Sequence, residues 1–98
     1  MNEEAQWLID ILYDKEANVS EKDDAAMDLA AFDFPEVTEA LVKKGSDLSE
    51  DPAILNSCGE SLGEIWARNK SFDKKAYDAL ASPAKEGVQL VFKDVRDR

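Results

Sequence analysis

Apolar residues recur along this chain with the spacing of an α-helix. In the first segment they stand at positions 5, 8, 9 and 12, which is the i, i+3, i+4, i+7 pattern of a helix with one buried face. The same period returns in five further segments, so the chain is expected to be all-α. The six expected helices cover residues 3–17, 20–32, 35–44, 51–69, 72–81 and 82–95.

Three helix starts are marked by capping residues. Ser20 precedes an apolar periodic segment and has an acid, Asp23, three residues later. Asp51 and Ser82 are each followed by a proline, which suits the first turn of a helix. The three caps are spaced by 31 residues, and each begins the second helix of a pair. This regular spacing predicts three helix pairs, an arrangement typical of stacked helical repeats.

The apolar positions predict which side of each helix is buried. Gly87 in the last helix, and Gly59 with Gly63 in the fourth, indicate close packing against a neighbouring helix. Residues 88–92 also fit a β-strand, but the proline-opened start and Val95 favour a helix there. The expected buried residues of the second, fourth and sixth helices are Ala25, Ala26, Leu29, Phe32; Ile54, Leu55, Cys58, Leu62, Ile65, Trp66; and Ala84, Val88, Val91, Phe92, Val95.

The fourth helix also carries a family resemblance. Asp51-Pro52-Ala53-Ile54, leading to Cys58 and then to Ser61-Leu62-Gly63-Glu64-Ile65, resembles the HEAT repeat family in its short bacterial form. Weaker echoes lie in residues 25–30 and 34–41, so the resemblance covers roughly residues 20–81. It implies a single domain, residues 1–98, built as an α-solenoid of three antiparallel pairs that binds a partner through its second helices. An ordinary six-helix bundle would show the same helical periods.

The charge of the chain narrows the choice of partner. The net charge is −10, from 22 acidic and 12 basic residues. The acids belong to the first two thirds of the chain, because residues 1–66 hold 17 acids and 4 bases. Such a surface disfavours nucleic acid and anionic membranes, whose phosphates attract Lys and Arg. A basic protein is the favoured partner, although a charged surface that only keeps the protein in solution explains the composition as well.

Little in the sequence points to catalysis, and we expect a chain that is not an enzyme. There is no histidine, which removes the commonest general base and most zinc sites. Cys58 lies on an apolar stripe, where a buried structural thiol is expected. No cofactor and no metal are expected. A single cysteine and a polar N-terminus without an apolar leader or membrane span favour the cytoplasm.

The candidate binding residues form acidic stripes on two helices. Asp24 and Asp28 share one face of the second helix, and Asn56, Glu60 and Glu64 share one face of the fourth. Trp66 is a candidate aromatic anchor for a partner, since the chain turns basic just beyond it.

Size, fold type and charge together resemble bacterial immunity proteins, including those of contact-dependent growth inhibition systems. This resemblance implies a partner that is a basic toxin, such as a nuclease domain, whose active site or exosite the chain would cover. A structural adaptor or a subunit of a larger assembly is the alternative.

Overall fold

The computed structural model describes residues 1–92, and these residues fold into helices with no strand among them. The all-α prediction is confirmed for this part of the chain. The strand alternative is wrong, because residues 88–91 belong to the last helix. The elements are α1 Glu3–Tyr13, α2 Val19–Asp28, the 3₁₀ turn η1 Leu29–Ala31, α3 Pro35–Gly45, α4 Pro52–Asn69, α5 Lys74–Ala79 and α6 Ser82–Val91.

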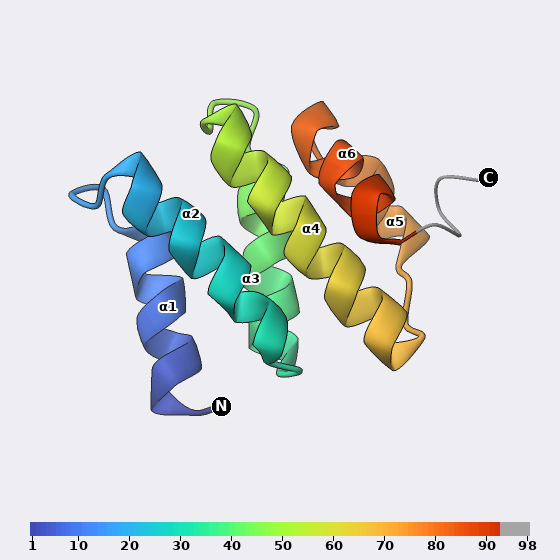
Figure 1. The fold of residues 1–98 in the computed structure, drawn as a ribbon, viewed down its shortest axis with the longest axis horizontal. Coiled ribbons are helices and arrows are strands. Elements are labelled where there is room, and N and C mark those ends of the chain that lie inside the picture. Colours follow the sequence, from blue (N-terminus) through green and yellow to red (C-terminus); the bar gives the residue numbers. More distant parts are fainter. Residues whose placement is uncertain (93–98) are drawn as a thin grey trace.

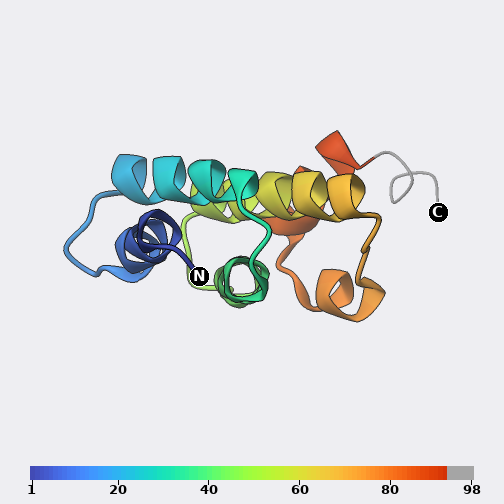
Figure 2. The ribbon, with the colours of Figure 1, turned by 90° about the horizontal axis from the view of Figure 1, so that it is seen from below.

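The helices lie in two layers. Helices α2, α4 and α6 lie side by side in one layer, and α1, α3 and α5 form the layer behind it (Figure 1, Figure 2). The longest helix, α4, is central: it packs against α2 on one side, α6 on the other and α3 beneath. Helices α2, α6 and α3 therefore contact α4 on three sides, and the fourth side of α4 faces solvent.

The helix starts differ in part from the sequence prediction. Asp51 caps α4 as predicted, accepting a hydrogen bond of 2.8 Å from the Ala53 N–H. The cap of α2 is Asn18 rather than Ser20: Asn18 Oδ1 accepts from the Glu21 N–H at 2.8 Å, and the Asn18 N–H donates to the Glu21 carboxylate. This reciprocal pair satisfies two free backbone donors at once.

The start of α6 also differs. Its N-cap is Ala81, and Ser82 is the first residue of the helix. The caps of α2, α4 and α6 thus stand at positions 18, 51 and 81, and the predicted equal spacing is wrong.

Several helix ends and buried positions in the structure also differ from the prediction. Helix α1 ends at Tyr13, because the Asp14 carboxylate accepts the Glu16 N–H and turns the chain. Val91 is 37% exposed although it was expected in the core. Phe32 and Phe92 are only partly buried. Helix α5 is shorter than predicted, and Val95 lies outside the described residues.

The centre of the molecule follows the prediction closely. All six stripe residues of α4, from Ile54 to Trp66, are at most 3% exposed. The predicted close packing at Gly59 and Gly87 is confirmed at the α4–α6 contact. A Cβ added to Gly59 would lie 1.9 Å from the Ala84 carbonyl oxygen, and one added to Gly87 would lie 2.2 Å from the Asn56 carbonyl oxygen. Only glycine lets the two backbones approach this closely.

Polar contacts tie α4 to its other neighbour, α2. The Ser61 hydroxyl donates to the Ala26 carbonyl oxygen at 2.6 Å, and the Ser57 hydroxyl donates to the Asp23 carboxylate. Small side chains therefore face both flanking helices from α4. The position and direction of α2 relative to α4 are set by these bonds as well as by apolar packing.

Candidate protein-binding surface

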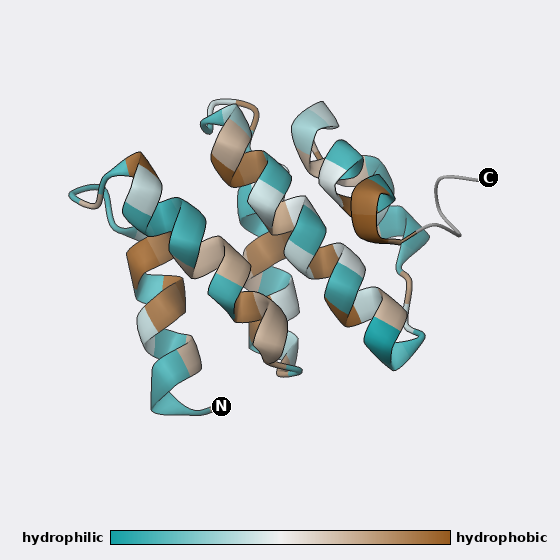
Figure 3. Cartoon of the chain, in the orientation of Figure 1, coloured by the Kyte–Doolittle hydropathy of each residue, from teal (hydrophilic) through white to brown (hydrophobic). Residues whose placement is uncertain are grey.

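Four of the predicted contact residues form what we call the acidic face: Asp24, Asp28, Glu60 and Glu64. Asp24, Asp28 and Glu64 are exposed, and Glu60 is half-buried. Helices α2 and α4, which carry them, are neighbours in one layer, and hydrophilic residues alternate with apolar ones along both ribbons (Figure 3). The structure thus brings the two predicted acidic stripes into the same layer of the fold.

None of these four carboxylates is neutralised by a cation within residues 1–92. The ion pairs of this part of the chain are Lys44–Glu50 at 3.0 Å, Arg68–Asp33 at 2.6 Å and Lys74–Asp78 at 2.7 Å. All three lie outside the acidic face. Like charges held on adjacent helices repel one another, and this repulsion lowers stability in proportion to how close they lie.

Two other predicted contact residues have structural roles. The Asn56 side-chain amide donates to the Pro83 carbonyl oxygen at 3.1 Å, which joins α4 to the start of α6. Trp66 is 2% exposed, and Phe72 covers it with a T-shaped contact of 5.4 Å between ring centroids. Trp66 also lines a groove of about 520 Å³ between α3 and α5, but almost none of the Trp66 side chain is accessible to solvent. The assignment of Trp66 as an exposed anchor is therefore corrected.

The exposed tryptophan of this molecule is Trp7, which is not among the predicted contact residues. Trp7 is 63% exposed. Among the exposed large hydrophobic residues of positions 1–92, it is the aromatic one. It precedes Leu8 and falls off the buried stripe of α1, and this helical position is the signal that could have identified it. It lines a groove of about 310 Å³ that we call the Trp7 groove, with Glu4, Leu8, Asp28, Ala31 and Phe32.

The floor of the Trp7 groove is held in place from below. Leu8 is 6% exposed and belongs to the core. Phe32 stacks on Phe34 with ring centroids 6.4 Å apart. The intervening Asp33 accepts hydrogen bonds from Arg68 at 2.6 Å and Asn69 at 2.9 Å, and the Arg68 bond lowers the pKa of Asp33. The segment after η1 is thereby tied to the end of α4, so the groove is formed before any partner arrives.

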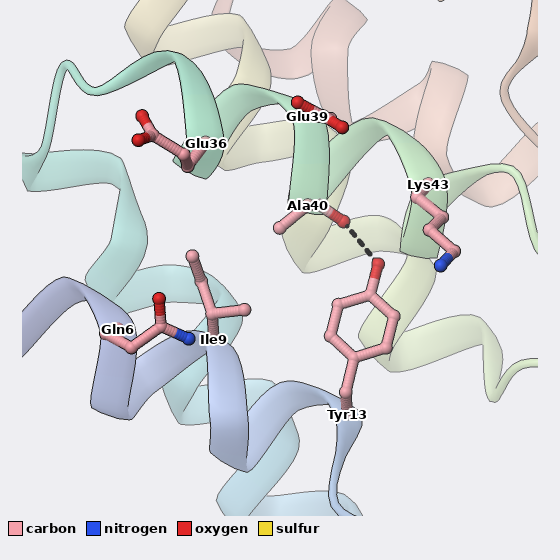
Figure 4. Close-up of a pocket in the computed structure, with 7 residues that line it drawn as sticks. All are labelled: Gln6, Ile9, Tyr13, Glu36, Glu39, Ala40 and Lys43. Carbon is pink, nitrogen blue, oxygen red and sulfur yellow. Dashed lines mark hydrogen bonds between the residues drawn. The ribbon is translucent and has the colours of Figure 1, made fainter. Parts of the chain in front are cut away.

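A second groove, of about 330 Å³, lies between α1 and α3 (Figure 4). Ile9 points into it, and Tyr13 closes one end by donating to the Ala40 carbonyl oxygen at 2.7 Å. Burial raises the pKa of Tyr13 to about 12, so the phenol stays protonated near neutral pH. A protonated phenol already bonded to the backbone stabilises the α1–α3 contact and does not supply a general base.

The remaining chemistry of the described residues is sparse. Cys58 is fully buried, and this burial raises the pKa of its thiol to about 12. Within residues 1–92, no three His, Cys, Asp or Glu side chains converge as metal ligands would. No helix in the same range combines the length and the apolar character needed to span a bilayer.

Comparison with known proteins gives no relative: no family model, no curated protein and no solved structure matches this chain.

Proposed function

We propose that this chain is a protein-binding module that acts as an immunity protein and neutralises a basic toxin, most concretely a nuclease domain. The observation that carries the proposal is the acidic face, whose four carboxylates have no cationic partner within residues 1–92. A basic protein docked on this face would supply the missing charges. Catalysis has no part in this role.

Electrostatics support a fast encounter with such a partner. The chain carries nine acidic side chains and two lysines in residues 1–32, which fold as the α1–α2 end of the molecule. Complementary charge raises association rates and suppresses wrong partners, and the gain falls as salt is added. A cytoplasmic immunity protein must bind its toxin before the toxin reaches nucleic acid, so a fast encounter suits the role.

The arrangement of the helices supports the proposed mode of binding. The second helix of each predicted pair, α2, α4 and α6, lies in one layer with the first helices behind (Figure 2). We propose that this is a HEAT-like solenoid of three pairs that presents its second helices to the partner. The acidic residues of α2 and α4 would then form one continuous contact surface.

The experiment starts from the product of the gene directly upstream, purified with the wild-type chain. A basic protein from that gene should bind at low salt, and the double reversal Asp24→Lys/Glu64→Lys should slow its association at least about tenfold. The matched control is Glu16→Lys/Glu39→Lys, which changes the net charge equally at exposed positions outside the acidic face. Equal slowing by both double variants, or no binding partner with basic character, would contradict the proposal.

A structural adaptor is the second candidate, and one observation favours it. Leu90 is 61% exposed and Val91 is 37% exposed on α6, the outer helix of its layer. Exposed apolar residues on a helix at the edge of a layer suit packing against another subunit. Light scattering after gel filtration tests this: an adaptor that assembles through α6 should lose its oligomeric state in Leu90→Lys, whereas an immunity protein should bind its toxin unchanged.

A further inference from the structure

We propose that the Trp7 groove binds the guanidinium group of an arginine side chain presented by the basic partner. This inference rests on the proposed function and specifies one contact within it. The groove joins an exposed aromatic ring to carboxylates from two helices, Glu4 of α1 and Asp28 of α2.

The apolar part of the groove accepts a flat, weakly hydrated group. Trp7 leaves 63% of its surface open, while Leu8 and Phe32 form a fixed floor beside it. A volume of about 310 Å³ lies at the lower end of the range for small-ligand sites, so it suits one long side chain rather than a cofactor. An open indole over a fixed floor is also the kind of surface that anchors protein interfaces.

The charged part of the groove selects a cation. Glu4 and Asp28 both line it, and neither forms an ion pair with any residue in positions 1–92. Asp28 is the last residue of α2, in a last turn that contains no basic side chain. The negative end of the helix dipole therefore adds to the field of the two carboxylates. A cation in the groove would relieve this unfavourable placement of Asp28.

Arginine fits this combination better than lysine. A planar guanidinium stacks on an indole face while its N–H groups donate to carboxylates at the edge. A lysine ammonium is a compact and strongly hydrated charge, which gains less from an apolar floor. Asp28 belongs to both the acidic face and the Trp7 groove, so an arginine here would mark one edge of the contact surface.

The test uses the full chain and three peptide amides as probes: tetra-arginine, tetra-lysine and tetra-citrulline, the last being a neutral analogue of arginine. Binding is followed by NMR at the two tryptophan indole N–H signals, and Trp7→Phe assigns the Trp7 signal. Tetra-arginine should shift the Trp7 signal and leave that of the buried Trp66 in place. Tetra-citrulline should bind at least about tenfold more weakly, since it lacks the charge.

Variants locate the site. Trp7→Ala and Glu4→Gln/Asp28→Asn should each weaken tetra-arginine binding at least about fivefold at physiological salt, where exposed charges beyond about 8 Å are screened. Glu16→Gln/Glu39→Gln removes the same number of charges at exposed positions outside both the groove and the acidic face, and should change binding less than twofold. Trp7 and both carboxylates lie at the surface, so these variants should fold, which circular dichroism verifies.

Three results would overturn the groove assignment: equal binding of the arginine and citrulline peptides, an unshifted Trp7 signal, or tetra-arginine binding that survives Trp7→Ala. If these occur while the basic partner is still lost in Asp24→Lys/Glu64→Lys, the groove assignment fails and the proposed function stands. If the groove selects arginine but no basic protein depends on the acidic face, the proposed function fails instead.

Discussion

The contact between α4 and α6 and the surface of α1 and α2 show two different uses of this sequence. Between α4 and α6, Gly59 and Gly87 bring two backbones so close that no side chain fits. On α1 and α2, Trp7, Asp24 and Asp28 are exposed, and the two carboxylates have no cation partner in the described chain. Close packing stabilises the first region, whereas like charges repel one another in the second. Such a difference is expected where a surface is kept for a partner.

The largest effect of a single substitution should come from filling the α4–α6 contact. Gly59→Ala gains about 1 kcal/mol of helix propensity but places a Cβ 1.9 Å from a carbonyl oxygen of the Ala84 backbone. Overpacking of this kind costs about 3 kcal/mol when backbone must move, so the net free energy of unfolding should fall by about 2 kcal/mol.

Gly45→Ala is the control for this substitution. Its Cβ would meet the flexible end of Leu80 at 3.1 Å, and stability should change by less than about 1 kcal/mol. Urea unfolding of both variants measures the difference. Equal stability of Gly59→Ala and wild type would mean that α4 and α6 are farther apart than described.

A second effect should appear at alkaline pH. Burial raises the pKa of Cys58 from 9.0 to about 12 and that of Tyr13 from 10.0 to about 12. Below pH 9 both groups are protonated in the folded and in the unfolded chain, so their ionisation does not lower the free energy of unfolding there. Above pH 9 the unfolded thiol ionises first, so stability falls by about 1.4 kcal/mol per pH unit for this one group until about pH 12.

Urea unfolding between pH 8 and pH 11 measures this loss, and Cys58→Ala should remove much of it. Tyr13→Phe should remove a smaller share, confined to the range above pH 10. A wild-type chain that is equally stable at pH 8 and pH 11 would contradict the burial of both groups.

A smaller effect concerns the thiol itself. Cys58 is fully buried and ionises only with difficulty, so it should react with a thiol reagent far more slowly in the native chain than in denaturant. Cys58→Ala should lower stability by about 1 kcal/mol through the small cavity it leaves. If the thiol reagent labelled the native chain as fast as the denatured chain, the Cys58 side of α4 would not be covered by its neighbouring helices.

The smallest effect should have the opposite sign. Asp28→Asn removes a negative charge from the last turn of α2, where it opposes the helix dipole. The free chain should become more stable by about 0.3 kcal/mol. Asp28 is part of the acidic face and of the Trp7 groove, so the same change should weaken partner binding. A thermal melt together with a binding titration checks both directions, and a loss of stability would indicate an unrecognised structural role.

The two regions also differ in how far the sequence could predict them. The Asp51-Pro52 start and the stripe from Ile54 to Trp66 were predicted because helical period and capping chemistry are local. The start of α2 was misplaced because Asn18 and Ser20 are both good caps, and only the bond that the Asn18 N–H donates to the Glu21 carboxylate decides between them.

The two tryptophans show why the surface was harder. Trp66 belongs to the buried stripe, but its cover comes from Phe72 in a later segment, and no local pattern shows that contact. Trp7 lies off its stripe, which predicts exposure but not the groove that Phe32 and Asp28 build beside it. The helical period places Asp24 and Asp28 on one face of α2, and Glu60 and Glu64 on one face of α4. Only the fold shows that these two helices lie in the same layer.

The most direct test of the acidic face is surface plasmon resonance with the basic partner at several salt concentrations. Wild type, Asp24→Lys/Glu64→Lys and the control Glu16→Lys/Glu39→Lys are compared for association rate, and their melting temperatures are recorded beside it. The account predicts association at least about tenfold slower for the acidic-face variant at low salt, converging with wild type as salt rises, with folding stability within about 0.5 kcal/mol. Identical association of all three proteins at every salt concentration would contradict it.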